Sequence, residues 1–197
     1  MIQKPLDTRK VLLIDMDNTI NKFWIGYQNA YNDLFRPGDL FYDGLKIEKE
    51  DLIEYDILIN FFPEREQSER DKIRQMIFEK KNFWLDLPLY DDADVIIKEL
   101  YKKYNTYIIT SPWTSAKNCY IEKIEWITKH LPFFELEKVI FTRDKWLVNC
   151  DYIIDDAPFY LEREDCETIA IDYAYNRHIF VNYRTENWNE IANYLGV

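Results

Sequence analysis

The stretch VLLIDMDNTI (residues 11–20) joins a run of aliphatic side chains to two aspartates that are separated by a single residue. Four aliphatic residues in succession are typical of a β-strand that is buried on both faces. Asp15 and Asp17 therefore follow at the point where such a strand leaves the core. Two like charges at that point raise each other's pKa unless a cation lies nearby. The stretch thus predicts both a central strand and a site that attracts positive charge.

Five further aliphatic or β-branched runs resemble the first. They are TYIIT (106–110), KVIFT (138–142), DYIID (151–155), TIAID (168–172) and HIFVN (178–182). Three helix-like stretches lie among or after them, namely DADVIIKELYKKY (92–104), KNCYIEKIEWITKHL (117–131) and TENWNEIANYL (185–195). Strands that alternate with helices of this length predict an α/β fold with a doubly wound, mainly parallel, Rossmann-like sheet.

Each helix-like stretch carries an apolar stripe that we expect to pack on the sheet. The three stripes are Val95, Ile96, Leu100 and Tyr104; Ile121, Ile124, Ile127 and Leu131; and Trp188, Ile191 and Leu195. We expect Thr185 to open the last helix, with Glu186 and Glu190 near its N-terminal half.

Between the first strand and the rest of the sheet the alternation is interrupted. The sequence there is aromatic and helix-like, in FWIGYQNAYNDLF, EDLIEYDILINFF and EREQSERDKIRQMIFEKKNFW. RPGD (36–39) is a helix-breaking turn that ends the first of these stretches. We therefore predict an inserted helical cap at residues 22–87, and a core domain made of residues 1–21 and 88–197.

The chain has 25 Lys and Arg against 36 Asp and Glu, which gives a net charge of −11 at pH 7. Such a surface repels duplex nucleic acid and anionic membranes, although a metal and a few cationic groups can still attract a small anionic substrate.

Three cysteines without CxxC spacing predict reduced core thiols. No apolar run approaches the roughly 18 residues of a membrane span, and the N-terminus has no apolar targeting segment, so we expect a soluble, cytoplasmic protein.

Polar side chains stand where four of the predicted strands end. In chain order they are Asp15 and Asp17, Thr110 and Ser111, Lys145, and Asp155 and Asp156. Open α/β sheets bind their ligands outside the carboxyl ends of the strands. The four strands should therefore deliver carboxylates, hydroxyls and one ammonium to a single edge.

The chemistry of this set indicates a phosphate bound beside Mg²⁺. Hard oxygen ligands without a neighbouring His or Cys select Mg²⁺ over Zn²⁺. Thr110, Ser111 and the backbone N–H groups of the following turn can donate to a phosphate, and Lys145 is a point charge suited to a phosphoryl group. One carboxylate of an Asp-x-Asp pair can act as a nucleophile and the other as general acid and base.

Each motif taken alone has a simpler interpretation. Acidic residues at strand ends often cap helices, TSPWT is typical of a helix start with an early proline, and a lone lysine is ordinary surface charge. The conjunction favours the functional interpretation, because all four motifs follow aliphatic strands and occur in the expected order.

In this combination the sequence resembles the phosphatases of the haloacid dehalogenase superfamily. The stretches that match that family's four motifs are DMDNT (15–19), Thr110–Ser111, Lys145 and Asp155–Asp156. The resemblance implies that Asp15 is the nucleophile and Asp17 the general acid and base. It also implies that Asp15, the backbone carbonyl of Asp17 and the carboxylate of Asp156 hold Mg²⁺, with Asp155 behind them. The residues implied to bind phosphate are Thr110, Ser111 and Lys145.

A closer resemblance is to the 5'(3')-deoxyribonucleotidases of that superfamily. The matching stretches are DMDNTINKF, KNFWLDLPLYDDA, IITSPWT, EKIEWI, FTRDKWLV and IIDDAP, which cover most of the core and the end of the insertion. The resemblance implies a cap that covers the active site and selects the substrate. It implies that aromatic side chains hold the nucleobase, since their faces stack on a base. These residues are Phe23, Phe78 and Trp84, with Tyr55 as a further candidate inside the insertion.

Two positions depart from that family's pattern. Asn18-Thr19 stands where relatives often carry glycine after the second aspartate, and Asn tolerates the left-handed conformation that glycine would adopt. We therefore expect the loop to keep its shape. Ala157 stands where closer relatives carry arginine, which removes a cation near the phosphate or the cap.

We expect a Mg²⁺-dependent phosphatase that hydrolyses nucleoside monophosphates through an aspartyl-phosphate. One alternative is another capped phosphatase, acting on a sugar phosphate or a nucleic-acid end. The other is a phospho-receiver domain without catalytic turnover, which also places carboxylates, a hydroxyl and a lysine at strand ends. The implied partner is a small nucleotide rather than duplex nucleic acid or membrane, and relatives often form homodimers.

Overall fold

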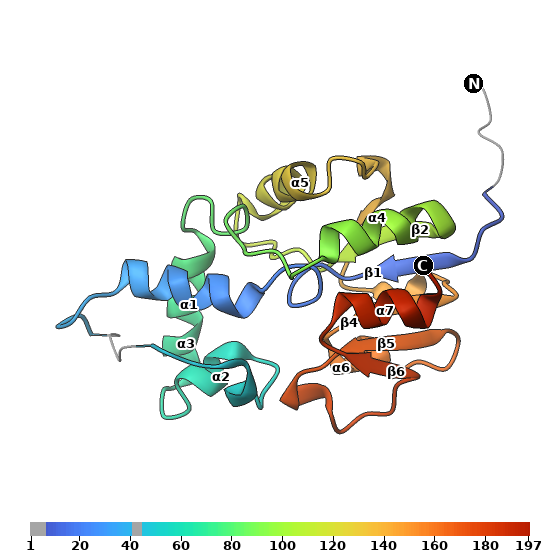
Figure 1. Cartoon of the computed structure of the whole chain (residues 1–197). Helices are drawn as coiled ribbons and strands as arrows, with labels where there is room; N and C mark the ends of the chain where they lie inside the picture. The colour runs from blue at the N-terminus through green and yellow to red at the C-terminus, as the bar shows by residue number, and fades with distance from the viewer. Residues whose placement is uncertain (1–6, 41–44) are drawn as a thin grey trace.

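The structure is a computed structural model, and it describes residues 7–40 and 45–197. Within these residues, six strands form one sheet in the spatial order β3-β2-β1-β4-β5-β6, and every neighbouring pair is parallel (Figure 1). The strands are β1 (Val11–Ile14), β2 (Asn105–Thr110), β3 (Val139–Phe141), β4 (Tyr152–Asp155), β5 (Glu167–Ile171) and β6 (Tyr183–Thr185). The prediction of an α/β fold with a doubly wound parallel sheet is confirmed.

Successive residues of the central strand face opposite sides of the sheet, as the strand geometry requires. Leu12 and Ile14 of β1 belong to a large apolar cluster, whereas Leu13 between them belongs to a smaller one. The large cluster includes residues of α4 (Ala93–Lys103), α5 (Cys119–His130) and α7 (Trp188–Leu195), and it continues into the helices of the segment 22–87. The smaller cluster includes Leu161 of the short helix α6 (Pro158–Leu161) and Ile179 from a loop.

The last strand lies further along the chain than its pattern predicted. HIFVN (178–182) forms a loop after the 3₁₀ helix η4 (Ala174–Asn176), so the strand predicted there is wrong, and β6 follows it directly. Ile179 is buried in the smaller cluster while Phe180 is exposed, so this apolar run covers the sheet from a loop.

Helix α7 starts later than expected. The side chain of Asn187 accepts a hydrogen bond from the backbone N–H of Asn189 at 2.9 Å and caps the helix. Thr185 therefore ends β6 rather than opening α7. The predicted stripe of Trp188, Ile191 and Leu195 is buried, as expected.

Helix α5 packs on the core with a side that only partly matches the predicted stripe, of which Ile127 and Leu131 are buried. Its buried residues are Cys119, Glu122, Lys123, Trp126 and Ile127. Ile121, which the predicted stripe included, is 63% exposed, and Ile124 is only half-buried. The helix is thus rotated so that two charged side chains face inward. In α4, Val95 is likewise exposed, whereas the other three residues of its stripe are buried.

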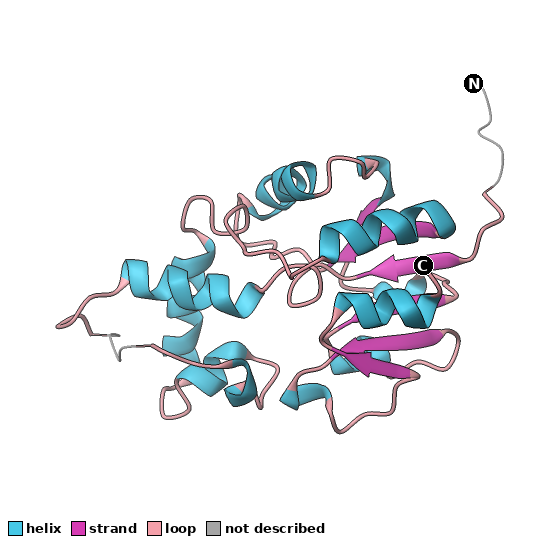
Figure 2. Ribbon diagram, in the orientation of Figure 1, coloured by secondary structure: helices cyan, strands magenta, loops and turns pink. Residues whose placement is uncertain are grey.

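The segment between β1 and α4 forms a group of helices beyond one end of the sheet (Figure 2). They are α1 (Phe23–Leu34), the 3₁₀ helix η1 (Lys49–Asp51), α2 (Ile57–Phe61) and α3 (Gln67–Phe78). Helix α1 ends just before the RPGD turn, as predicted. The described part of residues 22–87 contains no strand.

The chain enters and leaves this helical group at one place. The backbone N–H of Lys22 donates to the carbonyl of Pro88 at 2.7 Å, and the N–H of Tyr90 donates to the carbonyl of Ile20 at 2.9 Å. The two connections therefore lie side by side. Whether the segment 22–87 is a separate cap domain stays a prediction.

All three cysteines are free, but only Cys119 is buried, while Cys150 and Cys166 are half-buried. Among the described residues, no helix is both long and apolar enough to cross a bilayer.

Candidate active site

The carboxyl ends of β1 and β4 lie next to each other at the centre of the sheet. Asp15 follows β1 directly, and its backbone N–H donates to the carbonyl of Ile154 at 2.8 Å. Asp155 is the last residue of β4. From these two strands the chain continues toward opposite sides of the sheet, and open α/β sheets bind their ligands at such a switch point.

A buried lysine joins two of the carboxylates at this point. Nζ of Lys145 lies 2.5 Å from Oδ1 of Asp15 and 2.7 Å from Oδ2 of Asp155, and the lysine side chain is 2% exposed. Burial raises the pKa of Asp15 to about 7, against the attraction of Lys145. Burial lowers the pKa of Lys145, but attraction to Asp15 and Asp155 outweighs it and leaves that pKa above its usual value. Lys145 is therefore held in its charged form, and Asp15 ionises more readily as positive charge near it increases.

Asp156 completes a cluster of three carboxylates. Its Oδ2 accepts a hydrogen bond from the hydroxyl of Tyr175 at 2.5 Å, and its backbone carbonyl accepts one from the side chain of Asn176 at 2.8 Å. Burial, together with repulsion from Asp15 and Asp155, raises the pKa of Asp156. Carboxylate oxygens of these three aspartates lie within 4.8 Å of one another. One ammonium leaves an excess of negative charge, and this set of hard oxygen donors fits Mg²⁺.

Asp17 is held by a second buried lysine, Lys123 of α5. Nζ of Lys123 lies 2.5 Å from Oδ2 of Asp17 and 2.7 Å from Oγ1 of Thr110, and the lysine is completely buried. The side-chain amide of Asn21 donates to the other oxygen of Asp17 at 3.1 Å. The carboxylate of Asp17 is therefore fixed at both oxygens, and the hydroxyl of Thr110 is engaged with Lys123.

Asn18 turns the chain from the carboxylates into the helical group. Its φ is 58°, so it adopts the left-handed conformation that the sequence predicted. Its Oδ1 accepts a hydrogen bond from the backbone N–H of Trp24 at 3.0 Å, in the first turn of α1. One residue thus provides both the turn and an acceptor for a free backbone N–H of the next helix.

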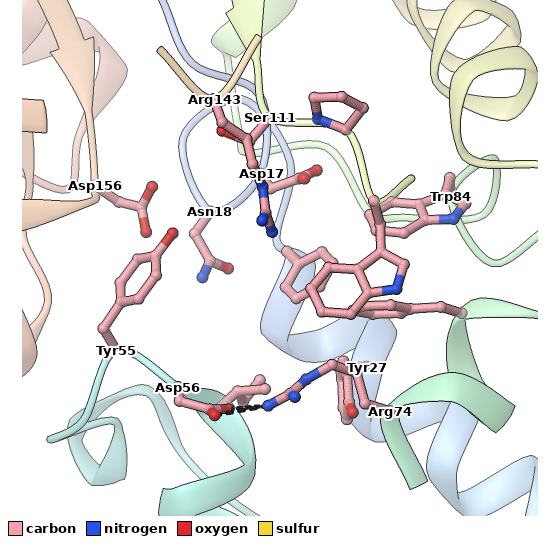
Figure 3. A pocket seen from close by; sticks show the side chains of 15 residues that line it. Asp17, Asn18, Tyr27, Tyr55, Asp56, Arg74, Trp84, Ser111, Arg143 and Asp156 are labelled. Atoms are coloured by element: carbon pink, nitrogen blue, oxygen red, sulfur yellow. Dashed lines mark hydrogen bonds and ion pairs between the residues drawn. The ribbon is translucent and has the colours of Figure 1, made fainter. Parts of the chain in front are cut away.

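A cavity of about 400 Å³ opens over these residues, between the sheet edge and the helical group. The strand-end residues that line it include Asp17, Ser111 and Asp156 (Figure 3). The hydroxyl of Ser111 lies 3.2 Å from the hydroxyl of Tyr160. Four predicted site residues do not line the cavity, namely Asp15, Thr110, Lys145 and Asp155. Lys145 pairs with Asp15 and Asp155, while the hydroxyl of Thr110 accepts from Lys123.

One wall of the cavity is aromatic. The centre of the Phe23 ring lies 5.7 Å from that of Trp84 and 6.0 Å from that of Phe78. The ring centres of Phe78 and Trp84 are 4.9 Å apart. Trp113, which follows β2, extends this wall and lies 4.9 Å from Phe78. The structure thus brings together three of the four aromatic residues that the resemblance implied for binding the base, namely Phe23, Phe78 and Trp84.

Tyr55 lies on the other side of the cavity, beside Asp156 (Figure 3). Its ring packs edge-on against Phe159 at 5.1 Å and Tyr175 at 5.5 Å, and the residue is 47% exposed. It therefore connects the helical group to the core across from the aromatic wall.

The end of the cavity away from the carboxylate cluster is polar. Asp56 and Arg74 form an ion pair there, with Nη2 of Arg74 2.6 Å from Oδ2 of Asp56 (Figure 3). Oδ1 of Asp56 also caps α2 by accepting from the backbone N–H of Leu58 at 3.1 Å. Tyr27 of α1 lines the same end.

Several residues of the site were not predicted from the sequence. They are Lys123, Tyr175, Tyr27, Asp56, Arg74, Trp113 and Arg143. For Lys123, a usable signal was its helical spacing from Cys119, Trp126 and Ile127, which share its buried side. For Asp56 and Arg74, no local pattern indicates that two helices of the insertion meet at a cavity.

Comparisons with known proteins place the chain among nucleotidases. The family described as 5' nucleotidase, deoxy (pyrimidine), cytosolic type C protein matches residues 9–197. A 5'(3')-deoxyribonucleotidase from Bacillus subtilis is 26% identical over 190 residues, which cover 95% of this chain and 99% of that protein. One from Clostridium acetobutylicum is 28% identical over 182 residues, covering 92% of each.

The fold has relatives among solved structures. A hydrolase of the haloacid dehalogenase-like family from Streptococcus pneumoniae superposes with a TM-score of 0.64. The sequences are 16% identical, and the match covers 95% of this chain and 98% of that one. At this identity the likeness concerns the fold, which is that of a haloacid dehalogenase-like hydrolase.

Proposed function

Since the chain belongs to the family of 5' nucleotidase, deoxy (pyrimidine), cytosolic type C proteins, we propose that it hydrolyses nucleoside monophosphates to nucleosides and phosphate. The observation that carries this proposal is the cavity, which joins an aromatic wall to Asp17, Ser111 and Asp156. An aromatic wall stacks on a planar base, and the strand ends beside it supply phosphate chemistry.

Asp15 is the nucleophile of the proposed reaction. Its carboxylate oxygen forms a bond to phosphorus while the bond between phosphorus and the nucleoside oxygen breaks, which leaves an aspartyl-phosphate. Water then attacks phosphorus, and the bond to Asp15 breaks. The ion pair between Lys145 and Asp15 supports this role, because it holds the carboxylate in place and favours its ionised form.

Asp17 moves the protons in both steps. Its carboxyl gives a proton to the departing nucleoside oxygen, and its carboxylate later takes one from the attacking water. Asp17 lines the cavity, two residues beyond the nucleophile. Ser111 and the backbone at Thr110 would bind the phosphate oxygens, and Lys145 would offset their charge.

Mg²⁺ is the metal that fits this donor set. The carboxylates of Asp15 and Asp156 and the backbone carbonyl of Asp17 would hold it, with Asp155 behind them paired to Lys145. When bound, the metal neutralises charge on the phosphoryl group and on the crowded carboxylates. Tyr175 holds the carboxylate of Asp156, and Asn176 holds its backbone carbonyl.

The segment 22–87 acts in this proposal as a cap that selects the substrate. Phe23, Phe78 and Trp84 would hold the face of the base, and Tyr55 would close the cavity from the other side.

The −11 net charge disfavours long nucleic acids as substrates. A receiver domain without turnover is not supported, because residues 9–197 match a nucleotidase family.

The direct test is phosphate release with and without Mg²⁺, over a panel of nucleoside monophosphates and sugar phosphates. We expect turnover of nucleotides only with Mg²⁺, and loss of more than about a thousandfold in kcat for Asp15→Asn. Activity on sugar phosphates with none on any nucleotide would sink the nucleotidase assignment. Near wild-type activity of Asp15→Asn would remove the nucleophile assignment alone.

A further inference from the structure

Two of the three cysteines meet where β4 and β5 begin. These strands are parallel neighbours, and the backbone N–H of Glu167 donates to the carbonyl of Asp151 at 2.9 Å (Figure 1). Cys150 precedes Asp151 and Cys166 precedes Glu167, so this hydrogen bond brings the two cysteines close together. Both pack against the smaller apolar cluster, on one face of the sheet and at the strand ends opposite to the carboxylates.

The two thiols are in direct contact, and the contact makes them unequal. Cys150 donates a hydrogen bond to the sulfur of Cys166, which raises the pKa of the Cys150 thiol and lowers the pKa of the Cys166 thiol. Both residues are free and half-buried. Cys166 is therefore the thiol that loses its proton more readily, and Cys150 is near enough to bond with it.

A guanidinium lies beside this pair. The side chain of Arg163 is 9% exposed, and its attraction further lowers the pKa of Cys166, against burial and the carboxylates of Asp165 and Asp151. Nε and Nη2 of Arg163 donate to Asp165 at 2.7 and 2.5 Å. Nη1 is buried and has no hydrogen-bond partner in the described part of the chain. A thiolate at Cys166 would thus lie beside a cation whose donor capacity is not fully used.

We propose that Cys166 and Cys150 form an oxidation site that reacts with hydroperoxides and closes to a reversible disulfide. The thiolate of Cys166 attacks one peroxide oxygen, so that an S–O bond forms, the O–O bond breaks, and the other oxygen leaves and takes up a proton. Cys150 then attacks the same sulfur, so that the S–S bond forms, the S–O bond breaks, and the oxygen leaves as water with the thiol proton. The two thiols lose two electrons and the peroxide gains them. This inference is independent of the proposed nucleotidase function.

Cys119 is an internal reference for the test. It is buried in α5, burial raises the pKa of its thiol, and the sulfur accepts from the backbone N–H of Trp113 at 3.3 Å. A buried thiol with a raised pKa reacts slowly with peroxides, so Cys119 should stay reduced where the other two react.

The test is mass spectrometry of the full-length, reduced protein after treatment with hydrogen peroxide. Free thiols are alkylated, and the protein is then digested without a reductant. We expect a pair of peptides joined through Cys150 and Cys166, which dithiothreitol separates, with Cys119 alkylated throughout. Absence of this cross-link, a cross-link between two chains instead, or equal oxidation of all three cysteines would overturn the proposal. This measurement needs no variant.

Two serine variants establish the order of the steps. In Cys150→Ser, oxidation of Cys166 should stop at the sulfenic acid, which dimedone traps. In Cys166→Ser, the remaining Cys150 should react with peroxide at least about tenfold more slowly than Cys166 does in Cys150→Ser. If Cys150 is instead the faster of the two, Cys166 is not the attacking thiol.

Arg163 is a positioning residue in this proposal, and its test is a pH profile. For Arg163→Gln we expect the midpoint of the alkylation rate of Cys166 with iodoacetamide to move to higher pH, whereas Arg163→Lys should retain part of the effect. Arg177→Gln is the control, because Arg177 is exposed and pairs with Asp172. An unchanged midpoint in Arg163→Gln would remove Arg163 from the site.

Discussion

Lys123 donates a hydrogen bond of 2.5 Å to the carboxylate of Asp17 while its own side chain is sealed from solvent. Its ammonium also lies 4.9 Å from the centre of the Trp84 ring, in the aromatic wall. A buried ammonium is stable only when paired, and Asp17 is the charged group that pairs it. Lys123 thus links Asp17, which is proposed to transfer protons, to Trp84, which is proposed to hold the base.

Replacing Lys123 should slow the second half of the reaction. The ammonium donates to Oδ2 of Asp17 and fixes the carboxylate that takes a proton from the attacking water. For Lys123→Met we expect kcat on p-nitrophenyl phosphate to fall about 10- to 100-fold, with a smaller fall in kcat/KM and a burst of p-nitrophenolate as aspartyl-phosphate accumulates. Lys129→Met, an exposed change on the same helix, is the control. A loss of thermal stability without any burst would assign Lys123 a structural role only.

Asp17→Asn should discriminate between leaving groups. The amide has no proton to give to the nucleoside oxygen, whereas p-nitrophenolate departs without protonation. We expect kcat/KM to fall at least about tenfold more for a nucleotide than for p-nitrophenyl phosphate. Equal losses on the two substrates would contradict the general-acid role of Asp17.

Tyr175→Phe should weaken Mg²⁺ binding. The hydroxyl of Tyr175 holds Oδ2 of Asp156, and partners that orient a metal ligand typically contribute about 10- to 100-fold in affinity. Calorimetric titration of the substrate-free protein with Mg²⁺ measures this change directly. Tyr183→Phe, on β6 and away from the cluster, is the matched control. An unchanged Mg²⁺ affinity in Tyr175→Phe would show that Asp156 is oriented by other contacts.

The stabilising effect of Mg²⁺ should depend on pH. Burial raises the pKa of Asp15 from 3.8 to about 7, so in the metal-free protein this group favours folding when protonated, and that contribution is lost as the pH rises from about 4 to about 7. Mg²⁺ binds the ionised form, and protons compete with it below pH 7. We expect the rise in Tm caused by a fixed Mg²⁺ concentration to be larger at pH 7.5 than at pH 5.5. Equal rises at the two pH values would show that Asp15 does not bind the metal.

The strand-end residues could be found from the sequence because each follows a local pattern. A short aliphatic run predicts a buried strand, and a parallel sheet brings the carboxyl ends together, which is why Asp15 and Asp155 meet around Lys145. The strand at 178–182 was misplaced because an apolar loop can cover a sheet face as well as a strand can pair in it. Ile179 is buried from such a loop.

The inward side of α5 could not be found by counting apolar residues. Glu122 is buried because its carboxylate accepts hydrogen bonds from the backbone N–H groups of Asn82 and Trp84, at 2.9 and 3.1 Å. Lys123 is buried because it pairs with Asp17. The predicted stripe was therefore right for Ile127 and Leu131 and wrong for Ile121, since polar contacts with distant segments also decide which side packs.

The polar end of the cavity depends on contacts that sequence spacing does not encode. Asp56 and Arg74 lie on different helices of the insertion, 18 residues apart, and Tyr27 comes from a third helix. The local sequence fixes only that Asp56 can cap a helix. Its position in the cavity follows from the packing of the three helices.

The hydrogen bonds that join Lys22 to Pro88 and Tyr90 to Ile20 make the two ends of the insertion neighbours. A segment whose ends meet can be exchanged for another of different length or shape without changing the path of the sheet. The aspartates that carry out the chemistry lie outside this segment, while the residues proposed to read the base lie within it. A new substrate specificity therefore requires sequence changes only between residues 22 and 88. The strand-end aspartates that cleave the phosphate can stay unchanged.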